Sequence, residues 1–177
     1  MRCSMTMLCR FIICPYKRGK SMAILEIKKA GDPVLKQVAE PIERLTKRHR
    51  QLLDDMAETM YSADGVGLAA PQVGKSLRIV VIDVQDEHGL LELVNPVITM
   101  REGSVVDSEG CLSVPQVYGD VERAERVTVE YTDRRSRRRT LTAEGLLARC
   151  IQHECDHLDG RLFIDIAVSL RKAEEKE

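Results

Sequence analysis

Two histidines four residues apart, with a glutamate directly after the first, limit the folds open to this chain. They occur in the segment His153-Glu154-Cys155-Asp156-His157, and on an α-helix residues at this spacing lie on one face, about one turn apart. Both imidazoles can then reach one ion, which lowers the pKa of a bound water so that the carboxylate takes its proton. This His-Glu-x-x-His pattern arises by chance in roughly one of a few hundred chains of this size, so it predicts a helix with a divalent-metal site.

The motif helix is expected to run from about Leu146 to Leu158. The segment Thr142-Ala-Glu-Gly145 is predicted to cap its start, and Gly160 is a suitable C-terminal stop. A second, amphipathic helix is predicted from Ile42 to about Asp64-Gly65, because apolar residues recur there every three to four positions among charged neighbours. Those apolar residues are Ile42, Leu45, Leu52, Leu53, Met56 and Met60.

Short strands are predicted in four places. The predicted strands are Arg78–Asp83, Glu92–Pro96, Val127–Tyr131 and Arg139–Thr142, and the first is rich in β-branched residues. The 177 residues fit one domain, and the sequence contains no internal repeat and no low-complexity linker. The pattern predicts an α+β fold, in which short, mostly antiparallel strands pack around a central helix that carries the His-Glu-x-x-His motif.

Residues 1–21 differ from the rest of the chain in their order of apolar and basic residues. An apolar stretch from Met5 to Cys14 is followed by Lys17, Arg18 and Lys20, which is nearly the reverse of the order in a signal peptide. Residues 1–21 are therefore interpreted as a disordered extension or an upstream start that precedes Met22. Residues 22–170 are expected to form the folded domain, and 171–177 a polar tail.

Composition excludes several classes of function. The 27 basic and 28 acidic residues nearly cancel, aromatic residues make up 3%, and Trp is absent, which argues against direct nucleic-acid binding. The basic run Arg134–Arg139 is interpreted as a solvated hairpin loop. No apolar run is long enough to span a membrane. The six cysteines are not spaced like a secreted disulfide scaffold, so a reduced, cytoplasmic setting is expected.

A third metal ligand is needed, because two histidines do not complete a site. A protease pattern with a third histidine would place it at position 163, which is Phe163, and a glutamate ligand would have to come from the polar tail. Cys150 lies one turn before His153, and three ligands from one straight helix converge poorly on an ion, so Cys150 is interpreted as a core residue. Cys111 is favoured because Gly110 permits an unusual backbone turn before it. Spacing alone leaves both cysteines open.

Three segments together resemble the peptide deformylase family. They are Gly65-Val-Gly-Leu-Ala-Ala-Pro-Gln72, Glu109-Gly-Cys-Leu-Ser113 and Gln152-His-Glu-Cys-Asp-His157. They occur in the family's order and at similar separations, and the resemblance covers nearly all of residues 22 to 168. It implies that residues 22–170 are a peptide deformylase catalytic domain. Such a hydrolase removes the formyl group from the N-terminal N-formylmethionine of newly made polypeptides and releases formate.

The resemblance also implies residue roles. The metal ligands would be Cys111, His153 and His157. Glu154 would be the general acid and base, while the side-chain amide of Gln72 and the backbone N–H of Leu112 would stabilise the developing oxyanion. The substrate-binding residues would be Gly65, Val66, Gly67, Arg149 and Cys150. The two glycines would let a substrate strand approach closely, and the remaining three, with His153, would border an apolar pocket for the methionine side chain.

Cofactor and partners follow from the same resemblance. One divalent ion is expected, with Fe²⁺ favoured and Zn²⁺, Ni²⁺ or Co²⁺ able to substitute. The expected partners are N-formylmethionyl nascent polypeptides in the cytoplasm. Some members use a longer basic C-terminal helix to dock on the ribosome, whereas the tail after Asp165 is short and of mixed charge, which argues against that contact here.

Two other functions stay open at this point. A general zinc endopeptidase would use the same helix, and it would cleave an unformylated internal peptide bond. A non-catalytic binding protein on a metal-stabilised scaffold would tolerate loss of Glu154 or Gln72.

Overall fold

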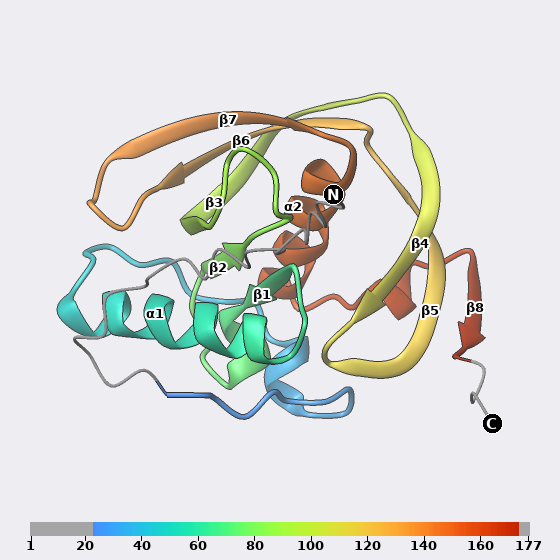
Figure 1. Cartoon of the computed structure of the whole chain (residues 1–177), viewed down its shortest axis with the longest axis horizontal. Coiled ribbons are helices and arrows are strands. Elements are labelled where there is room, and N and C mark those ends of the chain that lie inside the picture. The colour runs from blue at the N-terminus through green and yellow to red at the C-terminus, as the bar shows by residue number, and fades with distance from the viewer. Residues whose placement is uncertain (1–22, 174–177) are drawn as a thin grey trace, which may run out of the picture.

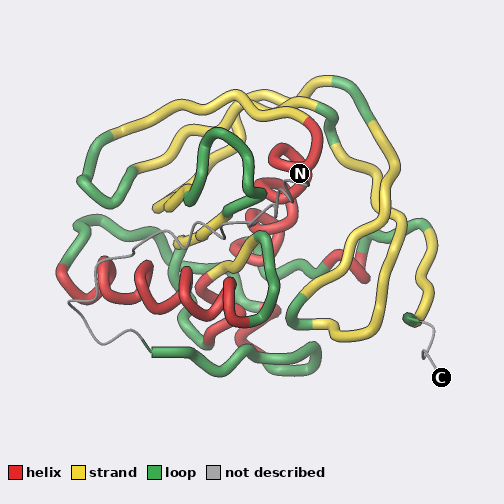
Figure 2. The backbone as a smooth tube through the Cα atoms, viewed as in Figure 1, coloured by secondary structure: helices red, strands yellow, loops and turns green. Residues whose placement is uncertain are grey.

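The structure is a computed structural model that describes residues 23–173 (Figures 1 and 2). The interpretation of residues 1–21 as an extension lies outside the described residues, as does that of residues 174–177 as part of a polar tail. Within 23–173, two helices and eight strands are joined by three short 3-10 turns. No described helix is long and apolar enough to cross a membrane.

The strands form two sheets, and every pair of neighbouring strands in them is antiparallel. One sheet has the order β1-β2-β3-β6-β7, with β1 Gly67–Ala69, β2 Ile79–Ile82, β3 Leu91–Glu102, β6 Arg126–Thr132 and β7 Arg138–Glu144. The other has the order β4-β5-β8, with β4 Val105–Cys111, β5 Val114–Arg123 and β8 Ser169–Lys172. The expected α+β fold with mostly antiparallel strands is confirmed.

Helix α2, Gly145–Leu158, carries the motif and is buried from Leu147 to its end. It packs against β1, β2 and β7 of the larger sheet, and Figure 1 shows it between that sheet and the β4–β5 hairpin. Its apolar side shares a core cluster with the larger sheet, including Ala148, Ile151 and Leu158. A helix enclosed on several sides holds its polar motif residues away from bulk water.

The predicted cap of α2 at Thr142 is wrong. Thr142 lies inside β7, where its hydroxyl is 3.1 Å from the hydroxyl of Thr128 on β6. The strand runs directly into the helix, and Gly145, with a φ of 56°, makes the turn between them. The end was predicted correctly: Asp159 is the C-cap and Gly160 follows in the left-handed region with a φ of 71°.

Helix α1, Lys47–Ser62, begins later than predicted. Its N-cap is Thr46, whose hydroxyl accepts a hydrogen bond from the N–H of His49. The backbone N–H and C=O of Ile42 are both taken, at 2.8 Å, by the side chain of Asn95, so they are not available to a helix. Ile42 still packs in the same apolar cluster as the helix, which is why the apolar spacing continues before the helix begins.

All four predicted strands exist, with different ends, but four others were missed. The predicted ones correspond to β2, β3, β6 and β7, and the missed ones are β1, β4, β5 and β8. Strand β8 includes Arg171 and Lys172, which the sequence assigned to the tail. The three 3-10 turns are η1 Pro33–Lys36, η2 Ala70–Val73 and η3 Phe163–Asp165.

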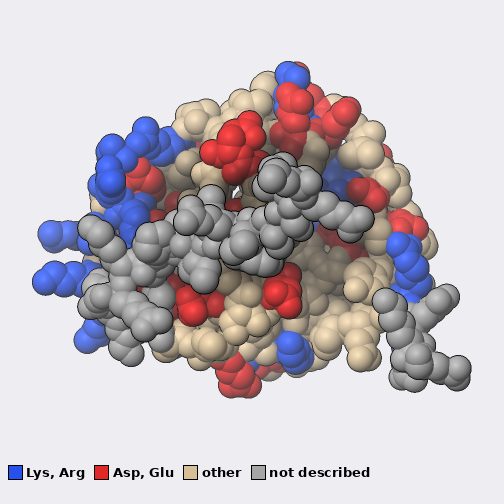
Figure 3. All heavy atoms as spheres, in the orientation of Figure 1, with Lys and Arg blue, Asp and Glu red and all other residues tan. Residues whose placement is uncertain are grey.

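The basic run forms the turn between β6 and β7 and the start of β7, as the hairpin interpretation requires. Lys and Arg side chains gather at this edge of the molecule, at the left of Figure 3. Their charge is partly neutralised within the protein. Arg134 pairs with Asp54 and Glu92, and Arg137 and Arg139 both pair with Asp133.

Candidate active site

The fold brings Cys111, His153 and His157 together from two elements. Cys111 is the last residue of β4, and the histidines lie one turn apart on α2. One donor atom from each lies within 4.8 Å of the others, and Cys111 Sγ is 3.3 Å from His157 Nε2. A sulfur and a nitrogen that bind the same tetrahedral ion are roughly 3.5 Å apart, given metal–ligand bonds of about 2.3 and 2.0 Å. The spacing therefore fits one ion between the three side chains.

The buried polar atoms around this group support the same fit. Glu154 Oε2 is buried with no hydrogen-bond partner among the described residues, and so is Nδ1 of His157. Burial, and then the nearby His153, hold the pKa of His157 well below its usual value. A neutral imidazole is the form that binds a metal, and the unpartnered carboxylate oxygen belongs to a residue that lines the same cavity as Cys111 and His153.

Cys111 is presented by an irregular strand end. The unusual turn predicted at Gly110 is wrong, since Gly110 is part of β4 and is not among the residues with positive φ. A Cβ at this position would lie 3.1 Å from the ring of Tyr118 on β5, so the glycine makes room for that ring. The irregularity is instead a register shift between Gly110 and Cys111 in the pairing with β5, directly before the sulfur.

The orientation of His153 is set by Glu109 on β4. His153 Nδ1 lies 2.9 Å from Glu109 Oε2, which leaves Nε2 of the same ring to face the metal group. Phe163, at the position of the missing third histidine, stacks on the His153 ring with the two centroids 6.1 Å apart. Both neighbours restrict the ring, as expected for a metal ligand that must be held in one rotamer.

Glu109 is in turn held by two buried arginines. Arg123 donates to its two carboxylate oxygens at 2.9 and 3.1 Å, and Arg149 donates to Oε1 at 2.7 Å. Arg123 also pairs with Asp156 of α2. Burial alone would raise the pKa of Glu109, but the hydrogen bonds from His153 and Arg123 outweigh it and hold the pKa at about 2. The carboxylate therefore stays ionised and ties β4 to the motif helix.

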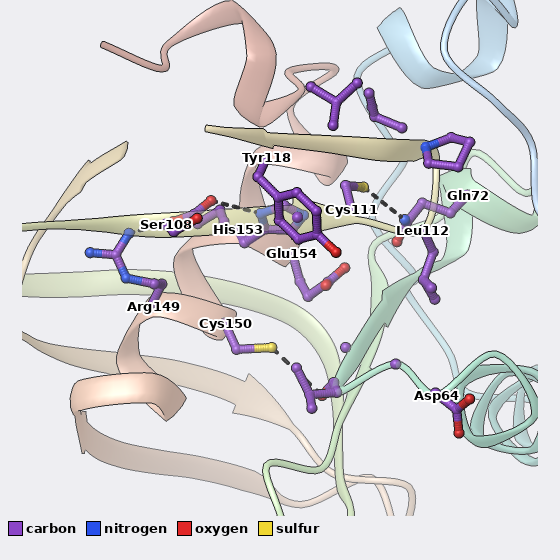
Figure 4. A pocket seen from close by; sticks show the side chains of 18 of the residues that line it. Asp64, Gln72, Ser108, Cys111, Leu112, Tyr118, Arg149, Cys150, His153 and Glu154 are labelled. Carbon is purple, nitrogen blue, oxygen red and sulfur yellow. Dashed lines mark hydrogen bonds and ion pairs between the residues drawn. The ribbon is translucent and has the colours of Figure 1, made fainter. Parts of the chain in front are cut away.

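Glu154 projects from α2 into the cavity beside the metal group (Figure 4). It is fully buried in its surroundings, and this burial raises its pKa to about 7. A carboxyl with a pKa near neutrality can both accept and return a proton. Gly67 makes the position possible, because a Cβ there would overlap Glu154 Oε1 and would lie 2.7 Å from Cys150 Sγ.

Gln72 lies on η2 with its side-chain amide fixed at both ends. Its Oε1 accepts from the N–H of Ala69 at 2.8 Å, and its Nε2 donates to Ser113 Oγ at 3.1 Å and approaches Cys111 Sγ at 3.5 Å. The amide nitrogen, rather than the oxygen, is thus turned toward the metal group (Figure 4). Leu112, in the turn after β4, lines the same cavity.

The cavity beside these residues has a volume of about 510 Å³, within the range of small-molecule and peptide side-chain sites. The five residues predicted to bind substrate, Gly65, Val66, Gly67, Arg149 and Cys150, all line it. So do Gln72, Cys111, Leu112, His153 and Glu154. Site residues predicted from three separate segments therefore surround one cavity, whereas His157 is not among the residues that line it.

Arg149 and Cys150, which were both predicted to border the pocket, direct their polar groups to different partners. Arg149 turns its guanidinium away into bonds with Glu109 and with the carbonyl oxygens of Val121 and Val105, both at 2.9 Å. Cys150 points its thiol at the carbonyl oxygen of Val66, 3.6 Å away, and burial raises the pKa of this thiol well above its usual value. Cys150 is not part of the metal group, which contains Cys111.

Several residues of the site were not predicted. Lys29, Tyr118 and Leu146 also line the cavity, and Arg123 supports Glu109. Arg123 stands fourteen residues after Glu109, across the β4–β5 hairpin, and no local pattern marks it. Even the register of the missed hairpin does not mark the contact, because it pairs Glu109 with Gly119 and Arg123 with Val105, and the long Arg123 side chain covers the remaining separation.

Known proteins match this chain over most of its length. The model of the family described as polypeptide deformylase matches residues 24–173. A peptide deformylase from Halothermothrix orenii is 52% identical over 149 residues, covering 84% of this chain and 97% of that protein. A crystal structure of a peptide deformylase from Legionella pneumophila has a TM-score of 0.79 at 48% identity, covering 81% of this chain and 86% of that one.

A second solved structure supports the same relationship. A peptide deformylase from Synechococcus elongatus, solved in complex with actinonin, has a TM-score of 0.78 at 50% identity, and the match covers 81% of this chain and 80% of that one. Removal of the formyl group from N-formylmethionine peptides is the activity of the matched family. On the evidence of its motifs, fold and relatives, the chain belongs to the polypeptide deformylase family.

Proposed function

We propose that Glu154 carries the proton in the deformylation of N-formylmethionyl polypeptides, at a metal held by Cys111, His153 and His157. The observation that supports this most is the buried Oε2 of Glu154, which has no hydrogen-bond partner among the described residues and belongs to a side chain that lines the same cavity as Cys111 and His153. Cys111, His153 and His157 would hold a divalent ion, which would supply Lewis-acid polarisation of the formyl carbonyl and a more acidic water for Glu154. Glu154 takes a proton from that water as the oxygen adds to the formyl carbon.

The same carboxyl completes the reaction. When the bond between the formyl carbon and the methionine nitrogen breaks, Glu154 returns the proton to that nitrogen, so a free amine and formate separate. Burial raises the pKa of Glu154, which favours a protonated form that can return the proton to the nitrogen. The backbone at Gly67 packs directly against the Glu154 carboxylate, because even a Cβ at this position would overlap Oε1. This close packing restricts the rotation of the carboxylate.

Gln72 and Leu112 are proposed to stabilise the oxyanion. The Gln72 amide is anchored by Ala69 and Ser113, so its nitrogen is already aimed at the metal group before substrate arrives. Leu112 directly follows the Cys111 ligand and lines the same cavity, which supports an oxyanion role for its backbone N–H. Donors that need no rearrangement stabilise a developing charge more effectively than solvent does.

The cavity is proposed to accept the methionine side chain and the first residues of the peptide. Gly65, Val66 and Gly67 offer a backbone edge that lacks bulky side chains at two of three positions. Cys150 and the stem of Arg149 add an apolar wall, because the charged end of Arg149 is bonded elsewhere. An unbranched thioether side chain suits an apolar wall of this kind.

We propose Fe²⁺ as the ion, with Zn²⁺, Ni²⁺ and Co²⁺ able to replace it. A donor set of one thiolate and two imidazoles suits each of these ions. Metal analysis of protein purified without oxygen, with activity measured on the same samples, tests this. Iron in equimolar amount that is lost together with activity in air supports Fe²⁺, whereas a stable, fully active zinc protein contradicts it.

The proposed partners are N-formylmethionyl nascent polypeptides in the cytoplasm. Cys111, Cys150 and Cys155 form no disulfide, and free thiols are typical of a reducing compartment, which supports that location. Direct contact with nucleic acid is not proposed, because much of the charge of the Arg134–Arg139 run is paired with acidic groups of the protein. Docking on the ribosome through the tail is not proposed either.

Formate release distinguishes this function from that of an endopeptidase. Purified protein should release one formate from each N-formylmethionyl tripeptide and leave the tripeptide's internal bonds intact. An unformylated peptide of the same sequence should not be cleaved. Cleavage of the internal bonds, or no release of formate from protein that holds its metal, would contradict the proposal.

A further inference from the structure

The segment before the first 3-10 turn joins two separate parts of the active site. The backbone N–H of Lys28 donates to the carbonyl oxygen of Gln72 at 2.7 Å, and the N–H of Ala30 donates to the carbonyl oxygen of Ser113 at 2.8 Å. We call Lys28–Ala30 the N-terminal strap. Because Gln72 belongs to η2 and Ser113 to the turn after β4, the strap sets how these two elements lie relative to each other.

The side chain of Lys29 adds a third contact. Its ammonium donates to the backbone carbonyl oxygen of Leu112 at 2.7 Å, and Lys29 lines the cavity together with Leu112 and Gln72. The bond spans 83 positions of the sequence, so it is not a product of local chain geometry. The strap therefore contacts both elements that carry the proposed oxyanion donors.

The Leu112–Ser113 turn is bonded to residues from outside its own hairpin. The register between β4 and β5 shifts just before Cys111, and Cys111 is already paired with Val114, so the turn has only two residues. Gln72 Nε2 donates to Ser113 Oγ at 3.1 Å. The Lys29 ammonium and the Ala30 N–H donate to the two carbonyl oxygens of the turn.

We propose that Lys29 is a positioning residue: its ammonium fixes the Leu112 turn so that the Leu112 N–H and the Gln72 amide point at the same oxygen. This rests on the proposed oxyanion role of those two groups. Small displacements of a donor matter, because an oxyanion donor acts only within a narrow range of distance and direction. Lys29 itself acts through the turn, and its role is thus separate from that of Glu154 and the metal ligands.

Three variants test the proposal on protein that holds its metal. Lys29→Met keeps the length of the side chain but removes the bond to Leu112, Lys29→Arg keeps a donor, and Lys28→Met is the matched control. The Lys28 ammonium bonds Glu26 on the exposed surface, and the backbone N–H of Lys28 is unchanged by the substitution. For each variant, kcat, KM, metal content and melting temperature are measured with one N-formylmethionyl peptide.

For Lys29→Met we expect kcat to fall by about three- to tenfold, a fraction of the loss that follows removal of a whole oxyanion donor. KM should stay within about twofold, since a donor aimed at the developing charge acts mainly in the transition state. Metal content should not change. Lys29→Arg should recover most of kcat, and Lys28→Met should match the wild-type protein.

Other patterns overturn the proposal. A kcat for Lys29→Met equal to wild type shows that the turn holds its position alone. A rise in KM with constant kcat shows that Lys29 binds the peptide instead. Equal losses in Lys29→Met and Lys28→Met show a general effect of removing surface charge. Failure of the proposed function is a different result, because then the wild-type protein itself releases no formate.

Discussion

Nδ1 of His153 lies 2.9 Å from Oε2 of Glu109, and this contact couples the motif helix to the strand that ends in Cys111. Glu109, two positions before Cys111 on β4, thereby fixes the proposed ligands Cys111 and His153 relative to each other. Arg123 extends the coupling, since it binds both Glu109 and Asp156. The geometry of the metal group is therefore supported by buried charges rather than by the ligands alone.

Replacing Glu109 should weaken metal binding. In Glu109→Gln the amide keeps the size of the side chain but loses the charge that orients His153 and pairs with Arg123 and Arg149. Loss of such a supporting contact typically costs ~10- to 100-fold in metal affinity. Competition with a chelator measures this, and the exposed Glu26→Gln is the control. An unchanged affinity in Glu109→Gln would show that His153 needs no support.

The two cysteines of the cavity should respond differently to serine. Cys111→Ser replaces the thiol that lies 3.3 Å from His157, so metal content and activity should be lost together. Cys150→Ser changes a group that contacts the carbonyl oxygen of Val66, so the metal should stay bound. Metal content per chain, measured for both variants after the same dialysis, checks this. Equal loss in the two variants would contradict the assignment of Cys111.

Gln72→Leu should lower kcat by ~10² to 10³ with little change in KM, as is typical for loss of one oxyanion donor. The two side chains are similar in size, and the backbone oxygen of residue 72 can still accept from Lys28. Steady-state kinetics on protein with full metal content gives the two constants. A higher KM at constant kcat would assign Gln72 to ground-state binding of the substrate.

A chain that begins at Met22 should fold and act like the full chain. The interpretation of residues 1–21 stays a prediction, but the domain is already anchored at its first described residues. The N–H of Ala23 donates to Asp55 at 3.0 Å, and the N–H of Leu25 donates to Thr59 at 2.9 Å. Melting temperature and kcat of the two chains are compared. A clearly lower value of either in the shorter chain would show that the first residues contribute.

The sequence identified the parts of the site that depend on local spacing. The histidines of α2 were predicted because their separation on a helix has a direct geometric meaning. The pairing of Glu109 with Arg123 was missed, since it depends on the β4–β5 hairpin, and β4 is rich in exposed and charged residues that do not resemble a buried strand. The start of α1 was misplaced for a similar reason, because Asn95, 53 positions away, takes the backbone groups of Ile42.

Lys29 is another residue whose proposed role could not be predicted from the sequence. Nothing near it in the sequence marks a functional residue, and its relation to Leu112 exists only once the chain has folded. Gln72, by contrast, was found through a resemblance of its whole segment. Its orientation, with Nε2 toward Cys111, depends on Ala69 and Ser113 and could not be read from that segment alone.

The proton-transfer role of Glu154 is tested most directly by Glu154→Gln, measured as formate release from an N-formylmethionyl peptide by protein of known metal content. The amide fills the same space beside Gly67 but cannot accept a proton, so the rate should fall by ~10² to 10⁴ while the metal bound by Cys111, His153 and His157 remains. A variant that keeps its metal and more than about a tenth of the wild-type rate would contradict the account, since loss of a general base costs far more.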